Sequence, residues 1–178
     1  NPNSGGANTI AIGADHGGFE LKQSLKEHLE AQGMAVQDYG PASDDSCDYP
    51  DFAQAVGKSV ASGQHAMGVL ICKSGIGMSI AANKIAGVRA ALVTDAESAS
   101  LTRAHNDANV ICFGANQTGA ETAKGIVDAF VKSAFEGGRH ARRVDKLESS
   151  LRVEVVDPDV DEVLRHEKQR QQENIELI

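Results

Sequence analysis

The feature that most constrains the fold is a regular alternation, from Thr9 onward, of short apolar runs with longer amphipathic stretches. The apolar runs are rich in Val, Ile, Leu, Ala and Cys, which is typical of parallel strands buried on both faces. The predicted strands are 9–13, 35–38, 68–72, 89–93 and 109–113. The predicted helices are 19–32, 51–62, 77–84, 96–105 and 120–136. The alternation predicts an α/β protein: a three-layer α/β/α sandwich, Rossmann-like, with a five-stranded parallel sheet and right-handed crossovers.

Length and composition indicate one compact domain with a tail. The chain has 178 residues, 41% of them hydrophobic, which is enough for one sizeable core and too little for two comfortable ones. Residues 1–8 are expected to form a flexible leader and residues 9–147 the domain. The composition changes after Leu147, and residues 148–178 are interpreted as an extension with a possible strand at 151–156 and a charged helix at 159–172.

Charge and cysteine content narrow the class of partner. The net charge of -8 argues against a sequence-independent nucleic-acid surface or an acidic-membrane surface, so a small ligand is expected. Three cysteines without paired spacing do not form a disulfide framework, which favours a reducing, cytoplasmic location. No apolar run approaches the roughly 20 residues of a membrane helix.

The segment Cys72-Lys73-Ser74-Gly75-Ile76-Gly77 follows a predicted buried strand. Its glycines lie where a helix begins, so that backbone N–H groups can face a bound anion and favour the thiolate form of Cys72. The alternative is a turn that serves close packing, with an inert buried cysteine like those expected at positions 47 and 112. The segment lacks the Lys-Ser/Thr pair of a Walker loop, so a nucleotide triphosphatase is disfavoured.

Further polar clusters flank other predicted strands. Asp15-His16 follows the first strand, Asn116 follows the fifth, and His105-Asn106 precedes the fifth. We expect these clusters to converge with the Cys72 loop at one edge of the sheet. A helix N-cap at Asp15 and a dipole partner at His105 are the structural alternatives.

The segment from Gly137 to Arg143 concentrates three arginines in an acidic chain, and its two glycines are expected to end a long helix. Arg139 and Arg143 share a face if the segment is helical, and their guanidinium groups suit a phosphate. A solvated cluster is the alternative.

These motifs together, in order and spacing over about residues 9–147, resemble type B ribose-5-phosphate isomerase. The resemblance rests on Gly13-Ala14-Asp15-His16-Gly17-Gly18-Phe19, Asp48-Tyr49-Pro50-Asp51, Cys72-Lys73-Ser74-Gly75-Ile76-Gly77, Ala81-Ala82-Asn83-Lys84, Arg103-Ala104-His105-Asn106-Asp107-Ala108-Asn109 and Gly137-Gly138-Arg139-His140. It implies an aldose–ketose isomerase, without metal or other cofactor, that interconverts ribose 5-phosphate and ribulose 5-phosphate. It also implies a homodimer, with a tetramer as the alternative, whose active sites are built from both chains.

The resemblance also implies roles for individual residues. Cys72 is the base that moves the proton, Ser74 relays protons between sugar oxygens, and His105 opens the furanose ring. The amides of the loop hold the enediolate. The other residues implied to contact substrate are Asp15 and Tyr49 at the sugar hydroxyls, Asn106 at the enediolate, Gly75, Ile76 and Gly77 in the loop, and His16, Arg139 and Arg143 at the phosphate.

Three positions distinguish this chain within the resembled family. One branch uses a glutamate where Met78 stands, and methionine cannot act as a base, so the chain fits the cysteine branch. Lys73 replaces a common glycine and is expected either to point outward or to meet substrate. Asn116 replaces a common phosphate-binding arginine. These two departures leave open another aldose phosphate, such as a six-carbon 6-phosphate, as substrate, and a non-catalytic sugar-phosphate sensor remains a third hypothesis.

Overall fold

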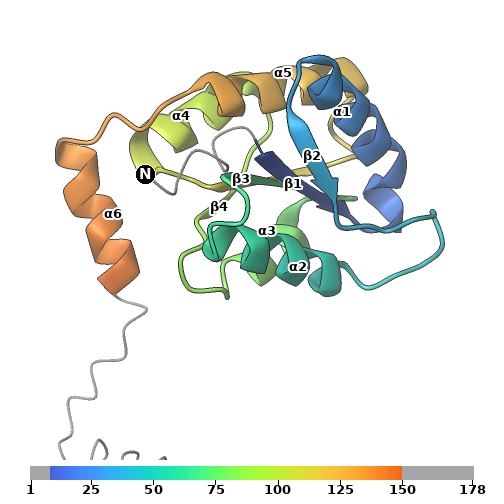
Figure 1. Ribbon diagram of the computed structural model, residues 1–178, viewed down its shortest axis with the longest axis horizontal. Coiled ribbons are helices and arrows are strands. Elements are labelled where there is room, and N and C mark those ends of the chain that lie inside the picture. The colour runs from blue at the N-terminus through green and yellow to red at the C-terminus, as the bar shows by residue number, and fades with distance from the viewer. Residues whose placement is uncertain (1–8, 150–178) are drawn as a thin grey trace, which may run out of the picture.

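A computed structural model describes residues 9–149. Its centre is a sheet of parallel strands in the order β2-β1-β3-β5-β4 (Figure 1). The strands are β1 (Thr9–Ala14), β2 (Ala35–Asp38), β3 (Met67–Cys72), β4 (Ala90–Leu92) and β5 (Val110–Gly114). The predicted five-stranded parallel sheet is therefore confirmed.

Helices cover both faces of the sheet, which confirms the three-layer sandwich (Figure 1). The helices are η1 (His16–Gly18), α1 (Phe19–Ala31), α2 (Tyr49–Ala61), α3 (Ile76–Ala82), α4 (Ala96–Asn106), α5 (Ala120–Lys132) and α6 (Arg139–Ser149). One core cluster joins the sheet to α1, α4 and α5, and the other joins it to α2 and α3. Because strand side chains alternate between faces, Ile71 packs in the first cluster and Cys72 in the second.

All five predicted helices are present with bounds shifted by one to four residues, and α2 and α5 show why. α2 begins at Tyr49, two residues before the predicted start, with Pro50 in its first turn, where the absent N–H of proline costs nothing. α5 ends at Lys132 rather than at 136, because Ser133 is extended and its hydroxyl donates to the Ala129 carbonyl at 2.7 Å. The prediction that the glycines at 137 and 138 end the long helix is therefore wrong, and they instead precede α6.

α6 stands beside the sandwich and packs on α4 (Figure 1). Val144 faces inward and is buried, while the positively charged residues of the helix are exposed. Glu148 near its end pairs with Arg89 at 2.7 Å, which ties α6 to the start of β4. α6 continues past the predicted domain boundary at Leu147, and the predicted strand at 151–156 and helix at 159–172 lie outside the described residues.

The helices found between residues 9 and 149 include none with the length and apolar content needed to cross a lipid bilayer.

Candidate active site

Cys72 ends β3 at the carboxyl edge of the sheet and is 5% exposed. The backbone N–H of Gly75 donates to its Sγ at 3.0 Å. This contact holds the sulfur at the start of the loop, where it can meet a bound ligand. α3 starts directly after this contact at Ile76, and the first turn of a helix leaves its backbone N–H groups without partners inside the helix. The loop thus combines a proton acceptor with donors for a developing negative charge.

The shape of this loop depends on Gly75. Its φ of 75° lies in the left-handed region, and an added Cβ would lie 2.7 Å from the backbone carbonyl carbon of Phe113 on β5. Only glycine satisfies both conditions without strain. The loop is anchored from the other side, because the N–H groups of Ala115 and Asn116 donate to the carbonyls of Cys72 and Lys73 at 2.8 and 3.1 Å.

Asp15 and His16 approach the Cys72 loop from the end of β1, the neighbouring strand. The Asp15 side chain is buried and caps η1, accepting from the N–H groups of Gly17 and Gly18 at 2.9 and 3.2 Å. The predicted N-cap is therefore present, and the carboxylate lies at the carboxyl end of β1, next to β3. Nδ1 of His16 accepts from the N–H of Cys47 at 3.4 Å, which holds the imidazole against the loop before α2.

Lys73 lies across Gly17. A Cβ added at Gly17 would collide with the Cγ of Lys73 and lie 3.1 Å from its Cε. The lysine therefore does not extend straight outward from β3, but runs over the turn that carries Asp15 and His16. Lys73 is exposed, and its side chain joins the turn after β1 to the Cys72 loop.

Tyr49 joins the site from α2, which packs on the same face of the sheet as Cys72 and α3. It is the first residue of α2, and its ring packs against Gly77, where an added Cβ would lie 2.8 Å from Cε2 and Cζ. The phenol is 39% exposed. The predicted residues Asp15, His16, Tyr49, Lys73 and the segment from Cys72 to Gly77 are thus brought together at the carboxyl edge of β1 and β3.

The other cysteines behave differently from Cys72. Cys112, two residues inside β5, has no exposed surface, and burial together with the neighbouring Cys72 raises the pKa of its thiol far above the ordinary value. Cys112 is therefore held as a neutral thiol. Cys47 is partly exposed in the loop before α2, and all three cysteines are free thiols.

His105 and Asn106 lie at the opposite edge, contrary to the expected convergence. α4 runs antiparallel to the strands and ends just before β5, so its last turn reaches the amino edge of the sheet. On β3, Gly68 pairs with the first residue of β5 and Cys72 pairs with the last. These positions are four residues apart, so the two edges of the sheet are about 13 Å apart. The physical reason is that a residue preceding a parallel strand and a residue following it lie at opposite ends of the sheet.

The amino edge carries its own cluster of charged and aromatic groups. The rings of His105 and His140 are stacked, with centroids 4.4 Å apart and an interplanar angle of 4°. The Oε2 atom of Glu136 lies 3.7 Å from Nε2 of His105 and 3.6 Å from Nε2 of His140. Burial lowers the pKa of His140, and the positive charges of His105 and Arg139 lower it further. We call His105, Asn106, Glu136, Arg139, His140 and Arg143 the amino-edge cluster.

Arg139 and Arg143 are one helical turn apart on α6, as predicted, and both are exposed. Nε of Arg139 donates to Nε2 of His140 at 3.4 Å, which places its guanidinium beside the stacked histidines. Within one chain, Arg139 and Arg143 lie on α6, far from His16, which is in η1 at the other edge of the sheet (Figure 1). The three residues predicted to bind phosphate are therefore divided between the two edges.

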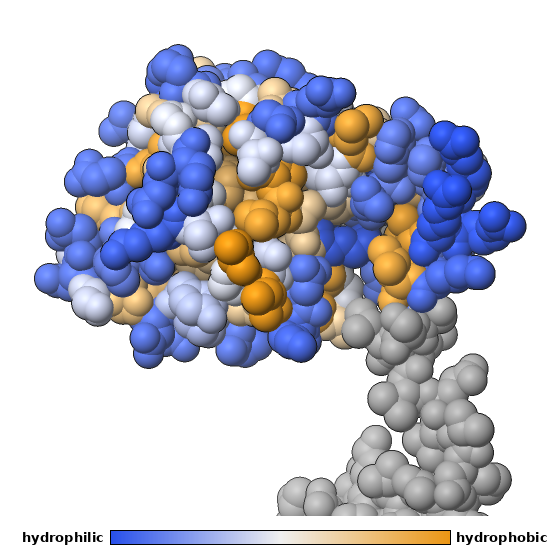
Figure 2. Space-filling model, turned by 180° about the vertical axis from the view of Figure 1, so that it is seen from behind, coloured by the Kyte–Doolittle hydropathy of each residue, from blue (hydrophilic) through white to orange (hydrophobic). Residues whose placement is uncertain are grey.

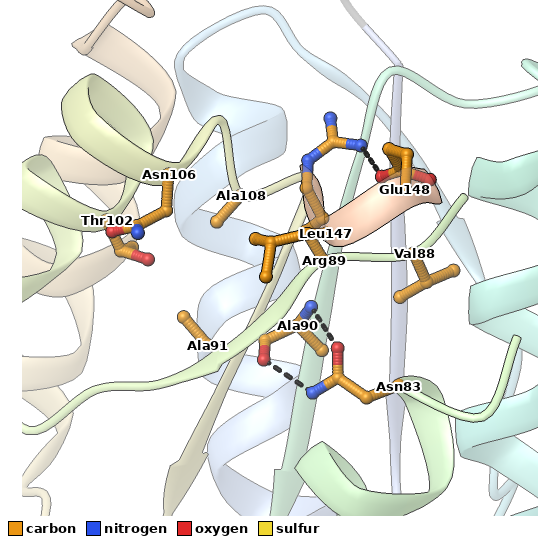
Figure 3. Close-up of a pocket in the computed structure, with 10 residues that line it drawn as sticks. All are labelled: Asn83, Val88, Arg89, Ala90, Ala91, Thr102, Asn106, Ala108, Leu147 and Glu148. Carbon is orange, nitrogen blue, oxygen red and sulfur yellow. Dashed lines mark hydrogen bonds and ion pairs between the residues drawn. The ribbon is translucent and has the colours of Figure 1, made fainter. Parts of the chain in front are cut away.

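An ion-pair network supports the amino-edge cluster. Arg89 pairs with Asp107 at 2.9 Å and with Glu148 at 2.7 Å, and Arg103 also pairs with Asp107. Asp107 closes α4 with a φ of 48°, a left-handed position that aspartate tolerates better than most residues. Figure 3 shows the adjoining pocket, in which Arg89 reaches Glu148 and the amide of Asn83 pairs with the backbone of Ala90.

Sequence reasoning missed Glu136 and His140 as site residues. His140 belongs to the Gly-Gly-Arg-His segment, so the motif contained a signal for it. Glu136 lies in an irregular segment predicted as helix, and only the fold of residues 133–138 brings it to the histidines.

Comparisons with protein families, curated proteins and solved structures all point to the same protein family. Residues 10–147 match the Ribose/Galactose Isomerase family. Ribose-5-phosphate isomerase B of Escherichia coli is 48% identical over 138 residues, which cover 78% of this chain and 93% of that protein. The structure of ribose-5-phosphate isomerase B from Clostridium thermocellum matches with a TM-score of 0.79 and 44% identity, over 80% of this chain and 96% of that one.

A third relative has a ligand. Ribose-5-phosphate isomerase B from Mycoplasma genitalium, solved with bound ribulose-5-phosphate, matches with a TM-score of 0.79 and 42% identity, over 82% of this chain and 97% of that one. The chain belongs to the ribose/galactose isomerase family.

Proposed function

We propose that the chain is an aldose–ketose isomerase that interconverts ribose 5-phosphate and ribulose 5-phosphate, with Cys72 as the base. The observation that carries the assignment of the base is the 3.0 Å contact from the Gly75 N–H to the Cys72 Sγ, at the start of a helix. The relatives named ribose-5-phosphate isomerase B support the substrate.

The reaction requires one proton to move between two carbons. The Cys72 thiolate takes the proton from C2 of the open-chain aldose, and the electron pair moves onto the C1 oxygen to give an enediolate. The backbone N–H groups at the start of α3 stabilise that negative charge. The Cys72 thiol then returns the proton to C1, while the Ser74 hydroxyl carries the hydroxyl proton of O2 to O1. Ser74 Oγ accepts from the N–H of Ile76 at 3.3 Å, which keeps the hydroxyl at the loop.

The remaining roles follow the chemistry of the side chains. Asp15 and Tyr49 bind sugar hydroxyls beside the loop, and the Gly75–Gly77 amides with Lys73 contact the reacting end. His105 opens the furanose ring by proton transfer, with Asn106 at the enediolate. His16, Arg139 and Arg143 bind the phosphate. No cofactor takes part in this sequence of steps.

These roles require two copies of the chain. One copy holds Cys72 and His105 at opposite edges of the sheet, so a single chain cannot place both on one sugar. We therefore assign each active site to the carboxyl edge of one copy and the amino-edge cluster of the other, in a homodimer with two-fold symmetry or in a tetramer built from such dimers.

An apolar band on the molecule supports this pairing. Ile76 and Ile80 on α3, Leu92 on β4 and Leu101 on α4 are each between 43% and 56% exposed. Leu92 lies against Gly75, so the band adjoins the Cys72 loop. Figure 2 shows hydrophobic side chains gathered between polar borders on the side of the molecule that is away from β2. A patch of this kind marks a surface that another protein covers.

The test is a metal-free assay of purified protein with ribose 5-phosphate. Cys72→Ala is expected to reduce kcat by roughly 10²- to 10⁴-fold, because it removes the group that carries the proton. Cys47→Ala is the matched control and should retain full activity, since this thiol has no role in the proposed steps. Cys72→Ala with wild-type kcat, or turnover that requires an added metal, would refute the assignment of the base.

A second candidate substrate is a six-carbon aldose 6-phosphate, favoured by the position of Lys73 across the substrate crevice and by Asn116. A panel of aldose phosphates tests it, and a higher kcat/KM for ribose 5-phosphate rejects it. Lys73→Gly then shows whether the lysine sets the preference. If no sugar phosphate is converted and Cys72 alkylates no faster than a free thiol, the protein is instead a sugar-phosphate sensor.

We infer a cytoplasmic location from the free state of the three cysteines, since a reducing compartment keeps such thiols unpaired.

A further inference from the structure

Three side chains of the amino-edge cluster have the chemistry of a metal site. The ligand atoms of His105, Glu136 and His140 all lie within 4.8 Å of one another. The two distances from the Glu136 Oε2 to the imidazole Nε2 atoms are 3.7 and 3.6 Å, which is long for a hydrogen bond. They are close to the separation of about 3.4 Å between two ligands of a tetrahedral zinc ion with bonds of about 2.0–2.1 Å.

We infer that His105, Glu136 and His140 bind one zinc ion per chain, and that zinc bound there inhibits the isomerase. Two histidines and one glutamate are a ligand set that zinc uses, with water in the fourth position. The ion is an inhibitor in this proposal and not a cofactor, because it occupies groups that the reaction needs free.

The three ligands are held by separate elements before any ion arrives. His105 lies in the last turn of α4, and His140 is the second residue of α6 and 5% exposed. Glu136 is positioned by its backbone N–H, which donates to the carbonyl of Ala104 at 3.0 Å. Folding thus brings the three side chains to one place before the ion binds.

The imidazole nitrogens are available as ligands. Because Nε2 of His140 accepts from Nε of Arg139 at 3.4 Å, it is unprotonated, and zinc can take its lone pair in place of that long hydrogen bond. The rings are parallel, so a shared ion requires one of them to turn. His105, whose side chain is 37% exposed, has the room to do so, whereas His140 is fixed by burial.

The neighbouring charges select the kind of metal. Arg139 and Arg143 oppose any cation, so an ion held mainly by charge, such as Mg²⁺, gains too little from one carboxylate. Zinc binds imidazole nitrogen strongly and tolerates this environment. Bound zinc takes the Nε2 of His105, which in the proposed function opens the sugar ring. The effect on turnover thus rests on the proposed function, whereas the binding of zinc does not.

Isothermal titration of the full chain with zinc chloride tests the binding. Wild type is expected to bind one zinc ion per chain and no Mg²⁺ at the same site. Glu136→Gln keeps the shape of the side chain but removes the carboxylate, and should weaken binding by about tenfold or more, equivalent to about 1.4 kcal/mol. Glu27→Gln, a change of the same kind on the exposed face of α1, should leave it unchanged. Cys72→Ala should also bind zinc normally, which separates this site from the thiol.

Turnover provides the second measurement. Zinc should inhibit the wild type reversibly, with recovery on addition of EDTA. The activity of Glu136→Gln, expressed relative to its own zinc-free rate, should fall less at the same zinc concentration. Equal zinc affinity of wild type and Glu136→Gln, or loss of binding in Cys72→Ala, overturns the site. Binding without inhibition of an active enzyme overturns the inhibitory role. If the protein converts no sugar phosphate, the proposed function fails, and the titration still decides the metal site.

Discussion

The two edges of the sheet carry the two halves of the proposed active site, and they are built in different ways. At the carboxyl edge, backbone atoms fix the geometry: a glycine N–H contacts the Cys72 sulfur, and Gly75 presses against the backbone of Phe113. At the amino edge, side chains hold one another through the stacked histidines and the ion pairs of Arg89 and Asp107.

The difference matches what each half must do. A base that moves a proton between adjacent carbons needs a position defined to a fraction of an ångström, which backbone contacts supply. The groups proposed to bind the phosphate, Arg139 and Arg143, are long exposed side chains that can reach a second copy of the chain. The amino-edge cluster is therefore suited to complete a site on another copy of the chain.

The largest expected effect comes from mixing two inactive variants. If each site takes Cys72 from one copy and His105 from the other, Cys72→Ala mixed with His105→Ala forms heterodimers with one intact site. Unfolding and refolding an equal mixture should recover about a quarter of the wild-type rate by the statistics of two-fold pairing. Each variant refolded alone serves as the control. A mixture as inactive as its components would show that the two edges do not share a site.

A second effect concerns the rigidity of the carboxyl edge. In Gly75→Ala the alanine has to adopt a left-handed φ, and its Cβ also collides with the backbone of Phe113. The free energy of unfolding should therefore fall by about 3 kcal/mol. Gly33→Ala is the matched control, because its φ is 80° but an added Cβ meets nothing within 4 Å. That change should cost only about 1 kcal/mol. Urea denaturation measures both, and equal losses would mean that packing against β5 contributes nothing.

The smallest expected effect is a pH dependence of stability that comes from His65, at the amino edge of the sheet. His65 lies just before β3, is buried, and has an Nδ1 without a hydrogen-bond partner in the described structure. Burial lowers the pKa of its imidazole, so the folded state disfavours the protonated form. The resulting stability is complete above the ordinary histidine pKa of about 6.5 and declines as the pH falls below it.

His65→Phe removes this titration while keeping an aromatic ring beside Tyr39, which the histidine contacts edge to face. The loss of unfolding free energy between pH 7.5 and 5.5 should therefore be smaller in His65→Phe than in wild type. Thermal unfolding at the two pH values measures it. His140, whose pKa is also lowered, remains in both proteins, so its contribution cancels. An unchanged or steeper pH dependence in the variant would contradict the proposed role of burial.

Much of the fold could be predicted from local signals. The strands follow from apolar runs and the helices from their spacing, and the Cys72 loop follows from glycines placed after a strand. The end of α5 could not be predicted, because no glycine or proline follows Lys132 before Gly137, whereas the backbone already becomes extended at Ser133. For the same reason the contact of Glu136 with His105 and His140 could not be predicted, since Glu136 was expected to lie in the helix.

The sequence by itself determined the α/β class and the family, and it predicted most residues of the proposed site, because periodicity and motif order are local properties of the chain. The tertiary structure decided which residues share an edge. His105 precedes β5, whereas Cys72 ends β3. Because β3 and β5 are parallel, the two residues lie at opposite edges of the sheet. That separation is the physical reason for proposing that a second copy completes each active site.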